Sequence, residues 1–249
     1  MIHLHHLKQS RSFRIIWLLE EMGIDYQLTT YERKNGLAPK RLKEIHPLGK
    51  APILQDNLQD KPHDSLENQR HDSIAKGDKT LVESAVIIDY LIDHYDTTAN
   101  PLNPELLASL KNAKQFRPDY GTPAYDNYRY WLHFAEGSLM PLLVMQLMLD
   151  TMVKKSPLPI RPISKMLKKG IDTSYLSQSL QSELVWIDQH LAKHDWFAGE
   201  QFSGADIQMA FGLDGLNNQQ PLDNNYPNIA NWLKKCHIRP AYQKAMLVA

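Results

Sequence analysis

The pair Glu83-Ser84 lies where a predicted strand turns directly into a predicted helix, in the run Thr-Leu-Val-Glu-Ser-Ala-Val-Ile-Ile-Asp-Tyr-Leu over residues 80–91. A helix that begins at such a corner leaves its first backbone N–H groups unpaired, and these groups and the helix dipole favour an anion. The corner therefore offers a carboxylate, a hydroxyl and N–H donors together. Such a set can bind a zwitterion, with its carboxylate on Ser84 and its ammonium on Glu83.

A second stretch, Gly-Lys-Ala-Pro-Ile-Leu over residues 49–54, predicts a short apolar strand that begins at Pro52. Proline supplies no backbone N–H donor, so it belongs at the first residue or the edge of a strand. The segment before Pro52 is then available to pair its backbone with an extended peptide, as an added strand. The two stretches together predict a site for a zwitterion that has a peptide backbone.

Length and charge narrow the class of protein. The 249 residues suffice for one or two domains. Lysine plus arginine equals aspartate plus glutamate, at 28 each, so nothing global points to a nucleic acid or an anionic membrane as partner. No apolar run approaches the ~20 residues of a membrane span, and the N-terminus does not read as a signal peptide. We therefore expect a cytoplasmic protein with no membrane and no nucleic-acid partner.

Cysteine usage limits the chemistry further. The single cysteine, Cys236, excludes an internal disulfide, a CxxC redox pair and a cysteine zinc site. Two His-Asp-Ser triplets within residues 63–73 fit no metal-ligand spacing. We expect no metal and no cofactor, and any thiol chemistry must use a thiol brought in from outside.

The first part of the chain predicts an α/β unit over residues 1–96. Alternating and periodic apolar residues indicate a strand, a helix, a second strand and a short helix, over residues 2–7, 10–22, 26–31 and 39–45. Ser10 and Ser12 are both candidate N-caps of the helix over residues 10–22. The two site stretches then add two strands and a helix. Residues 57–79 between those strands are polar and unpatterned, and they predict an insertion loop.

The second part, residues 101–249, reads as helical almost throughout. A long apolar helix is expected over residues 125–152, with a kink at Pro141. Residues 154–169 contain six basic residues, three prolines and no acid, and we interpret them as a solvated connector. Ser203-Gly-Ala-Asp206 predicts a capping box at the start of another helix, with a role in folding. The second domain is therefore predicted to be all α.

The order and spacing of these features resembles the cytosolic glutathione S-transferases over nearly the whole chain. The resemblance rests on Ala51-Pro52, on Glu83-Ser84, on the Ser-x-x-Asp box, and on the closing patterns over residues 226–233 and 239–242. The insertion after Asp56 departs from relatives, which usually have a short turn there. The resemblance implies a thioredoxin-like N-terminal domain over residues 1–96 and an all-helical bundle over residues 101–249.

The resemblance also implies how glutathione is bound. Ala51-Pro52 matches the cis-proline of the family, whose preceding residue pairs its backbone with the cysteinyl unit of glutathione. Glu83 and Ser84 match the pair that holds the γ-glutamyl amine and carboxylate. Lys50 looks like the cation that faces the glycyl carboxylate.

The predicted catalytic residue is Ser10, because it lies where the serine-type and cysteine-type classes of the family keep their activating residue, just after the first strand. The resemblance therefore implies a serine-type, bacterial-like member. Arg14 completes the Ser-x-x-x-Arg spacing of serine-type relatives. A free thiol has a pKa of ~8.5, and a hydrogen bond from the Ser10 hydroxyl and the start of the following helix both favour the thiolate. Ser12 is the alternative donor. In either case the serine donates a hydrogen bond and is not the nucleophile.

The expected activity is transfer of glutathione to an apolar electrophile, as in detoxification, with the electrophile held against the second domain. Relatives are usually homodimers, and we expect one here. The alternative is a glutathione-binding carrier or interaction scaffold of the same fold without useful turnover. A thiol–disulfide reductase or peroxidase is disfavoured, because a serine cannot form a mixed disulfide.

Overall fold

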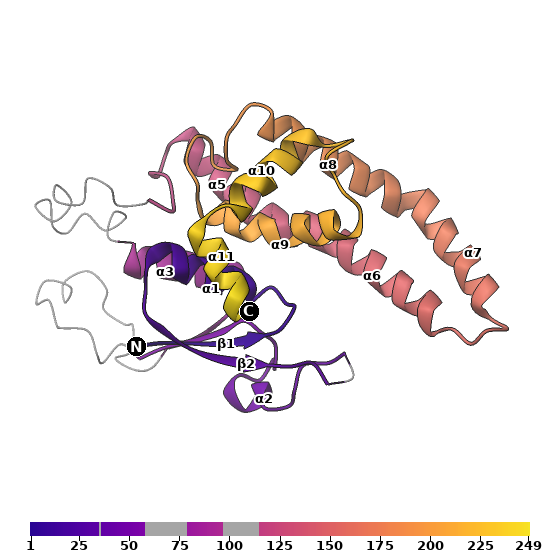
Figure 1. Cartoon of the computed structure of the whole chain (residues 1–249), viewed down its shortest axis with the longest axis horizontal. Coiled ribbons are helices and arrows are strands. Elements are labelled where there is room, and N and C mark those ends of the chain that lie inside the picture. Colours follow the sequence, from indigo (N-terminus) through magenta and orange to yellow (C-terminus); the bar gives the residue numbers. More distant parts are fainter. Residues whose placement is uncertain (35, 58–78, 97–114) are drawn as a thin grey trace, which may run out of the picture. The chain divides into compact units, whose positions relative to one another are not determined.

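The computed structural model describes residues 1–34, 36–57, 79–96 and 115–249. Nearly all of the insertion predicted over residues 57–79 lies outside these described residues. The chain divides into two compact units (Figure 1). The first comprises Met1–Lys114 and Arg239–Ala249, and the second comprises Gln115–Ile238.

A four-stranded mixed sheet forms the centre of the first unit, with the strand order β2-β1-β3-β4. Strand β1 (Ile2–Leu7) pairs in parallel with β2 (Tyr26–Tyr31) and antiparallel with β3 (Ile53–Asp56), which pairs antiparallel with β4 (Lys79–Val82). In this register Leu4 lies opposite both Leu28 and Leu54. The parallel pair is possible because the helix between β1 and β2 carries the chain back across the sheet. The strands lie where the sequence predicts them.

Helix α1 (Phe13–Met22) connects β1 to β2 and is buried on most of its surface. Residues Ile15 to Leu19 of this helix are all fully buried, as expected from an apolar run that shows no polar face. It packs against β1, against α3 (Ser84–Tyr95) and against α11 (Pro240–Val248). The short helix α2 (Leu42–Ile45) lies before β3. These helices hold the corner at Glu83 and the turn after β1 in place.

The last helix, α11, packs in the first unit, although the sequence assigned it to the helical domain over residues 101–249. The guanidinium of Arg239 donates two hydrogen bonds to the carboxylate of Glu21 on α1, at 2.5 and 2.8 Å. The ring of Tyr242 meets the ring of Trp17 edge-on, with the centroids 4.9 Å apart. Because α1 carries apolar side chains on more than the one side that the sheet covers, another element has to cover the rest, and α11 does so.

The second unit begins with one continuous helical run, Pro123–Lys155, made of α5 (Pro123–Phe134), a π-helical turn η3 (Ala135–Leu139) and α6 (Met140–Lys155). The π-helical turn directly precedes Pro141, the residue where we expected a kink. A wider turn accommodates a proline ring that has no N–H to give to the preceding turn.

This run has the length and apolar composition that a membrane span requires, with a mean hydropathy of 1.3 over its best window. This run differs from the sequence expectation, because polar residues interrupt its apolar side chains along the chain. By length and composition alone a core helix also meets this requirement. The first half of the run packs Tyr128 and Trp131 inside the second unit, each 1% exposed.

A second continuous helical run consists of α7 (Arg161–Ile171), η4 (Asp172–Leu176) and α8 (Ser177–Leu191). Helix α7 corrects our interpretation of residues 154–169 as a connector. Pro162 lies in the first turn of this helix, where a missing N–H costs nothing, so it starts the helix instead of preventing it. Helices α6 and α7 pack against each other as a hairpin (Figure 1).

Helices α9 (Gly204–Gln219) and α10 (Pro227–His237) complete the second unit. The predicted capping box at the start of α9 is confirmed: Ser203 and Asp206 exchange the two reciprocal bonds. Asp206 is fully buried, and burial raises the pKa of its carboxyl to about 6 even though hydrogen bonds to the carboxylate oppose the rise. The box therefore joins the helix start to the core of this unit.

Candidate functional site

A pocket in the first unit brings together the residues that the sequence predicted to bind glutathione. It lies between the segment before β3 and the corner between β4 and α3. Its lining consists of Arg11, Leu48, Lys50, Ala51, Pro52, Val82, Glu83 and Ser84. The strands β3 and β4 are adjacent in the sheet, which is why two segments some 30 residues apart meet there.

Glu83 occupies the corner with its backbone at φ 72°, in the left-handed region that non-glycine residues rarely adopt. The residue is in the N-cap position of α3, but its side chain makes no capping hydrogen bond. The carboxylate is exposed and has no hydrogen-bond or ion-pair partner within the described part of the chain. Such strained backbone is typical of binding sites, and the carboxylate is available to a ligand.

Ser84 is the first residue of α3 and is nearly buried. Its hydroxyl oxygen accepts a hydrogen bond from the guanidinium of Arg14 on α1, at 3.1 Å. Because the oxygen accepts from Arg14, its proton is left to donate to a ligand. The sequence singled out Arg14 only for its spacing from Ser10 and missed this contact. An arginine inside the apolar run over residues 13–19 was the available signal.

The segment before β3 supplies the other wall of the pocket. The Ala51–Pro52 peptide bond is cis. The strand begins only at Ile53, so Ala51 and Pro52 precede the ladder of hydrogen bonds between β3 and its neighbours. Lys50 is exposed and forms no ion pair within the described residues. The ammonium of Lys50 and the backbone of Ala51 are therefore both accessible from the pocket.

The charges around this pocket match a particular kind of ligand. Arg11 and Lys50 are cations, and Glu83 is an anion. The start of α3 adds backbone N–H donors beside Ser84. A ligand with two carboxylates and one ammonium complements this set, and a γ-glutamyl tripeptide has those groups.

Ser10 and Ser12 lie in the turn between β1 and α1 and form a buried hydrogen-bonded chain with His6. The Ser10 and Ser12 oxygens are 2.7 Å apart, and the Ser12 oxygen is 2.8 Å from Nδ1 of His6. The Ser12 oxygen also accepts from the backbone N–H of Leu7, at 3.1 Å. Ser12 is completely buried, whereas Ser10 is 8% exposed and precedes Arg11 of the pocket. Neither serine makes a side-chain capping bond with α1, although Ser12 is in the N-cap position.

The donor in each hydrogen bond among His6, Ser12 and Ser10 can be assigned by counting protons. Burial, and to a smaller extent the charge of Lys8, lower the pKa of His6 to about 4, so its ring is neutral near pH 7 and carries one proton. Nε2 of His6 is buried and has no hydrogen-bond partner. An orphaned N–H is costlier and rarer than an orphaned lone pair, so the proton belongs on Nδ1.

The hydrogen bonds then run in one direction. His6 Nδ1–H and the Leu7 N–H both donate to Ser12, which uses up its two lone pairs. The Ser12 proton has two acceptors, the oxygen of Ser10 at 2.7 Å and the carbonyl oxygen of Leu7 at 3.3 Å, and the shorter contact assigns it to Ser10. The oxygen of Ser10 also accepts the Ser12 backbone N–H at 3.3 Å. The Ser10 proton is the one donor left over. Both serines were predicted from the sequence, but no pattern in the sequence indicates that His6 contacts Ser12.

The lowered pKa of His6 predicts a specific dependence of stability on pH. As the pH falls below 6.5, the unfolded chain binds a proton at this histidine before the folded protein does, so the stability falls between pH 6.5 and about 4. His6→Asn keeps an N–H donor and does not titrate, so its stability should fall less over this range. Urea unfolding at a series of pH values measures the difference, with the exposed His133→Asn as control. Parallel curves for wild type and His6→Asn would contradict the assignment.

Comparison with known proteins agrees with this fold. Residues 10–94 match the family model "Glutathione S-transferase, N-terminal domain", and residues 145–240 match "Glutathione S-transferase, C-terminal domain". The chain is 35% identical over 241 residues to Glutathione S-transferase 3 of Schizosaccharomyces pombe, covering 97% of this chain and 85% of that protein. The chain belongs to the glutathione S-transferase family. It is also 28% identical to Glutathione S-transferase 1 of Saccharomyces cerevisiae, over 97% of this chain and 92% of that protein.

Solved structures of this family superpose on the whole chain. The crystal structure of a glutathione S-transferase from Actinobacillus pleuropneumoniae is 32% identical and has a TM-score of 0.68, covering 100% of this chain and 92% of that one. A glutathione transferase homologue from Lodderomyces elongisporus, with two GSH per subunit, has a TM-score of 0.70 at 18% identity, covering 99% of this chain and 98% of that one. The predicted fold class, a small mixed α/β domain with a helical domain, is confirmed. The serine-type, bacterial-like subtype stays a prediction.

Proposed function

We propose that this member of the family is an active glutathione transferase, which binds glutathione as its thiolate and adds it to an apolar electrophile. One observation carries the proposal: Lys50, Ala51, Pro52, Glu83 and Ser84, chosen from the sequence, line a single pocket whose charges complement glutathione. The glutathione in the homologue from L. elongisporus supports the choice of ligand.

In this proposal each end of glutathione has its own partner. Glu83 binds the γ-glutamyl ammonium, and Ser84, held by Arg14, binds the adjacent carboxylate together with the N–H groups that begin α3. Lys50 faces the glycyl carboxylate. The backbone of Ala51 pairs with the cysteinyl unit, which directs the thiol toward the turn that carries Ser10.

The free proton of Ser10 is proposed to stabilise the thiolate. The thiol gives its proton to water, and the sulfur that remains accepts the hydrogen bond from Ser10. The sulfur then forms a bond with the electrophilic carbon as the leaving group departs with its electron pair. Ser12 is a weaker candidate, because its proton already goes to Ser10 and its side chain is completely buried. His6 and Ser12 act as positioning residues.

Two alternatives make different demands on the same residues. A carrier or scaffold without turnover needs the binding residues but not the free donor at Ser10. A reductase needs a reactive thiol, and the single cysteine of the chain, Cys236, is buried on α10.

We further propose a role in detoxification, an apolar electrophile pocket, a homodimeric assembly and a cytoplasmic location, on the strength of the family resemblance alone.

Replacing Glu83 by glutamine tests the binding mode. Glu83→Gln removes the charge that the ammonium needs, and a charged hydrogen bond contributes about 2 kcal/mol, so the Kd for glutathione should rise roughly 30-fold. Titration calorimetry measures the Kd. Glu200→Gln, at an exposed carboxylate of the second unit, is the matched control and should bind as wild type does. Equal binding by Glu83→Gln and the control would contradict the proposed orientation of glutathione.

A further inference from the structure

The hairpin between α6 and α7 ends in a tip, defined here as residues 150–172, that exposes large apolar side chains to solvent. Leu158, in the connection between the two helices, is 77% exposed, and Met166 on α7 is 67% exposed. Several neighbours are at least half exposed as well, namely Ile160, Ile163 and Leu167. Each such side chain loses a favourable burial of about 1.5–3 kcal/mol by remaining in water. So many exposed apolar side chains close together indicate a surface that binds a ligand, another protein or a membrane.

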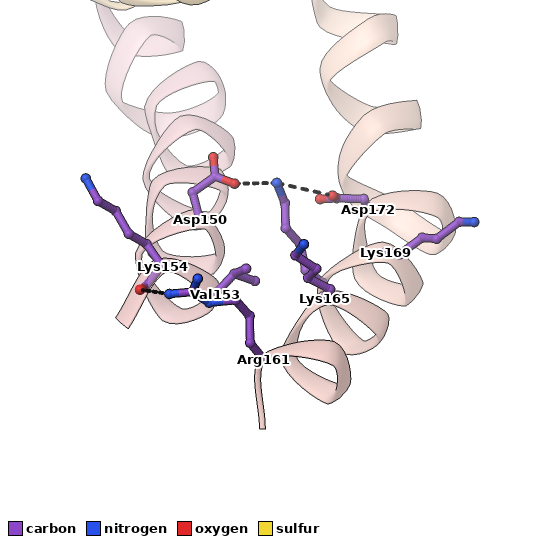
Figure 2. Close-up of a pocket in the computed structure, with 8 residues that line it drawn as sticks. Asp150, Val153, Lys154, Arg161, Lys165, Lys169 and Asp172 are labelled. Carbon is purple, nitrogen blue, oxygen red and sulfur yellow. Dashed lines mark hydrogen bonds and ion pairs between the residues drawn. The ribbon is translucent and has the colours of Figure 1, made fainter. Parts of the chain in front are cut away.

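The tip is also strongly basic, although the chain as a whole has zero net charge. Within residues 150–172 six cations and two carboxylates leave a net charge of +4. Most of these groups line a pocket of about 450 Å³ between α6 and α7 (Figure 2). Its lining consists of Asp150, Val153, Lys154, Arg161, Lys165, Lys168, Lys169 and Asp172.

Only part of this positive charge is neutralised within the tip. The ammonium of Lys168 pairs with the carboxylate of Asp150 on α6 and lies 3.8 Å from that of Asp172. The dashed lines that end at the labelled Asp150 and Asp172 in Figure 2 mark these two contacts. Lys154, Lys165 and Lys169 form no ion pair with the described residues, and Figure 2 shows Lys154 and Lys169 extending outward on either side. The pair at Lys168 therefore joins the two helices, while the remaining ammonium groups are available to an anionic partner.

Helix α7 separates its charged and apolar residues onto two faces. Arg161, Lys165, Lys168 and Lys169 recur three or four residues apart, which places them on one side of a helix with 3.6 residues per turn. Ile163, Met166 and Leu167 fall on the opposite side by the same spacing. A basic face and an apolar face on one exposed helix are typical of helices that lie in the interface of a membrane.

We propose that the tip of the α6–α7 hairpin binds the surface of an anionic lipid bilayer. The apolar side chains at Leu158, Met166 and Leu167 enter the boundary of the headgroups, and the unpaired lysines contact lipid phosphates and carboxylates. A free anion would leave the apolar side chains in water. A second copy of the tip would place two charges of +4 against each other. A bilayer satisfies both faces.

This proposal departs from the sequence expectation of no membrane partner. That expectation rested on the zero net charge of the chain, which averages the basic tip with acidic segments elsewhere. The attraction to a bilayer acts within a Debye length of about 8–10 Å, so the local charge of the tip decides it.

Sedimentation of the full-length protein with phosphatidylcholine vesicles, with and without phosphatidylserine, tests the proposal. Wild type should bind the anionic vesicles, bind the neutral vesicles far less, and dissociate as salt is added. Lys165→Gln/Lys169→Gln should bind roughly 30-fold more weakly, from about a fivefold loss per lysine. Leu158→Ser/Leu167→Ser should bind at least about tenfold more weakly. Lys193→Gln/Lys234→Gln, at two exposed lysines elsewhere in the second unit, should bind as wild type does.

All of these positions are exposed, and circular dichroism would verify that each variant is folded. Failure of wild type to bind anionic vesicles at low salt would overturn the proposal. Equal loss of binding in the control pair would also overturn it, because the site would then be a diffuse charge. Light scattering without vesicles tests whether a second copy of this chain binds the tip instead. A dimer that dissociates only in Leu158→Ser/Leu167→Ser, together with no binding to vesicles, would assign the tip to self-association.

Discussion

Replacing Ser10 by alanine should lower kcat/KM for glutathione conjugation by roughly 30-fold, because a hydrogen bond to a charged group contributes about 1.5–3 kcal/mol. The assay uses a small apolar electrophile at saturating concentration and a series of glutathione concentrations. Ser182→Ala, at an exposed serine on α8, is the matched control and should react as wild type does. The same activity in Ser10→Ala as in this control would contradict the role of Ser10.

Ser12→Ala separates the two serines. It removes the proton that orients Ser10 and leaves His6 Nδ1 and the Leu7 N–H without their acceptor, so we expect a smaller loss of activity together with a loss of stability. The Ser10 hydroxyl remains, and it can still rotate toward the sulfur. A full loss of activity in Ser12→Ala with none in Ser10→Ala would make Ser12 the donor.

Replacing Asp206 by alanine should lower the free energy of unfolding by about 4 kcal/mol, which is more than the ~0.5–3 kcal/mol that most single substitutions cost. The carboxylate accepts hydrogen bonds at 2.9 Å from the Phe197 N–H, the Ser203 N–H and the Trp232 indole N–H, and one at 3.0 Å from the Ser203 hydroxyl. Alanine would leave buried donors without acceptors, at about 1–3 kcal/mol each before the core relaxes.

Urea unfolding at neutral pH measures this loss. Asp206→Asn should be intermediate, because the amide oxygen accepts some of these bonds while its NH₂ group faces other donors. Asp223→Ala, at an exposed aspartate of the same unit, is the control and should unfold as wild type does. A loss below about 1 kcal/mol in Asp206→Ala would show that water replaces the carboxylate and that the box does not join α9 to the core.

The sequence predicted those parts of the site that depend on local signals. The corner at Glu83 follows from a strand that runs directly into a helix, and the position of Pro52 follows from its missing N–H. The capping box at Ser203 is a four-residue pattern that acts within its own turn. Each of these features is decided by neighbours in the chain, which is why the pattern alone was sufficient.

Features that depend on tertiary packing were missed. His6 reads as part of an alternating strand, and nothing local indicates that both faces of the strand become covered and that its ring meets Ser12. The contact between Arg14 and Ser84 joins residues 70 apart in the chain. The docking of α11 on α1 depends on Glu21 and Arg239, which are 218 residues apart. Such partners cannot be read from spacing in one sequence.

The hairpin tip shows a different limit of sequence reasoning. Pro157, Pro159 and Pro162 were interpreted together as marks of a connector, because proline breaks a helix interior. The first two lie in the connection between α6 and α7, but Pro162 lies in the first turn of α7, where its fixed φ suits a helix. Whether a proline precedes a helix or lies in its first turn depends on the residue at which the helix begins. The packing of α6 against α7 determines that residue.

The most direct test of the proposed mechanism is the pKa of glutathione bound to the protein, followed through the ultraviolet absorbance of its thiolate as the pH is raised. In wild type we predict a pKa well below the ~8.5 of a free thiol, and in Ser10→Ala a pKa that returns toward that value. Ser182→Ala should titrate as wild type does. An identical bound-thiol pKa in wild type and Ser10→Ala would contradict the claim that the Ser10 hydroxyl stabilises the thiolate.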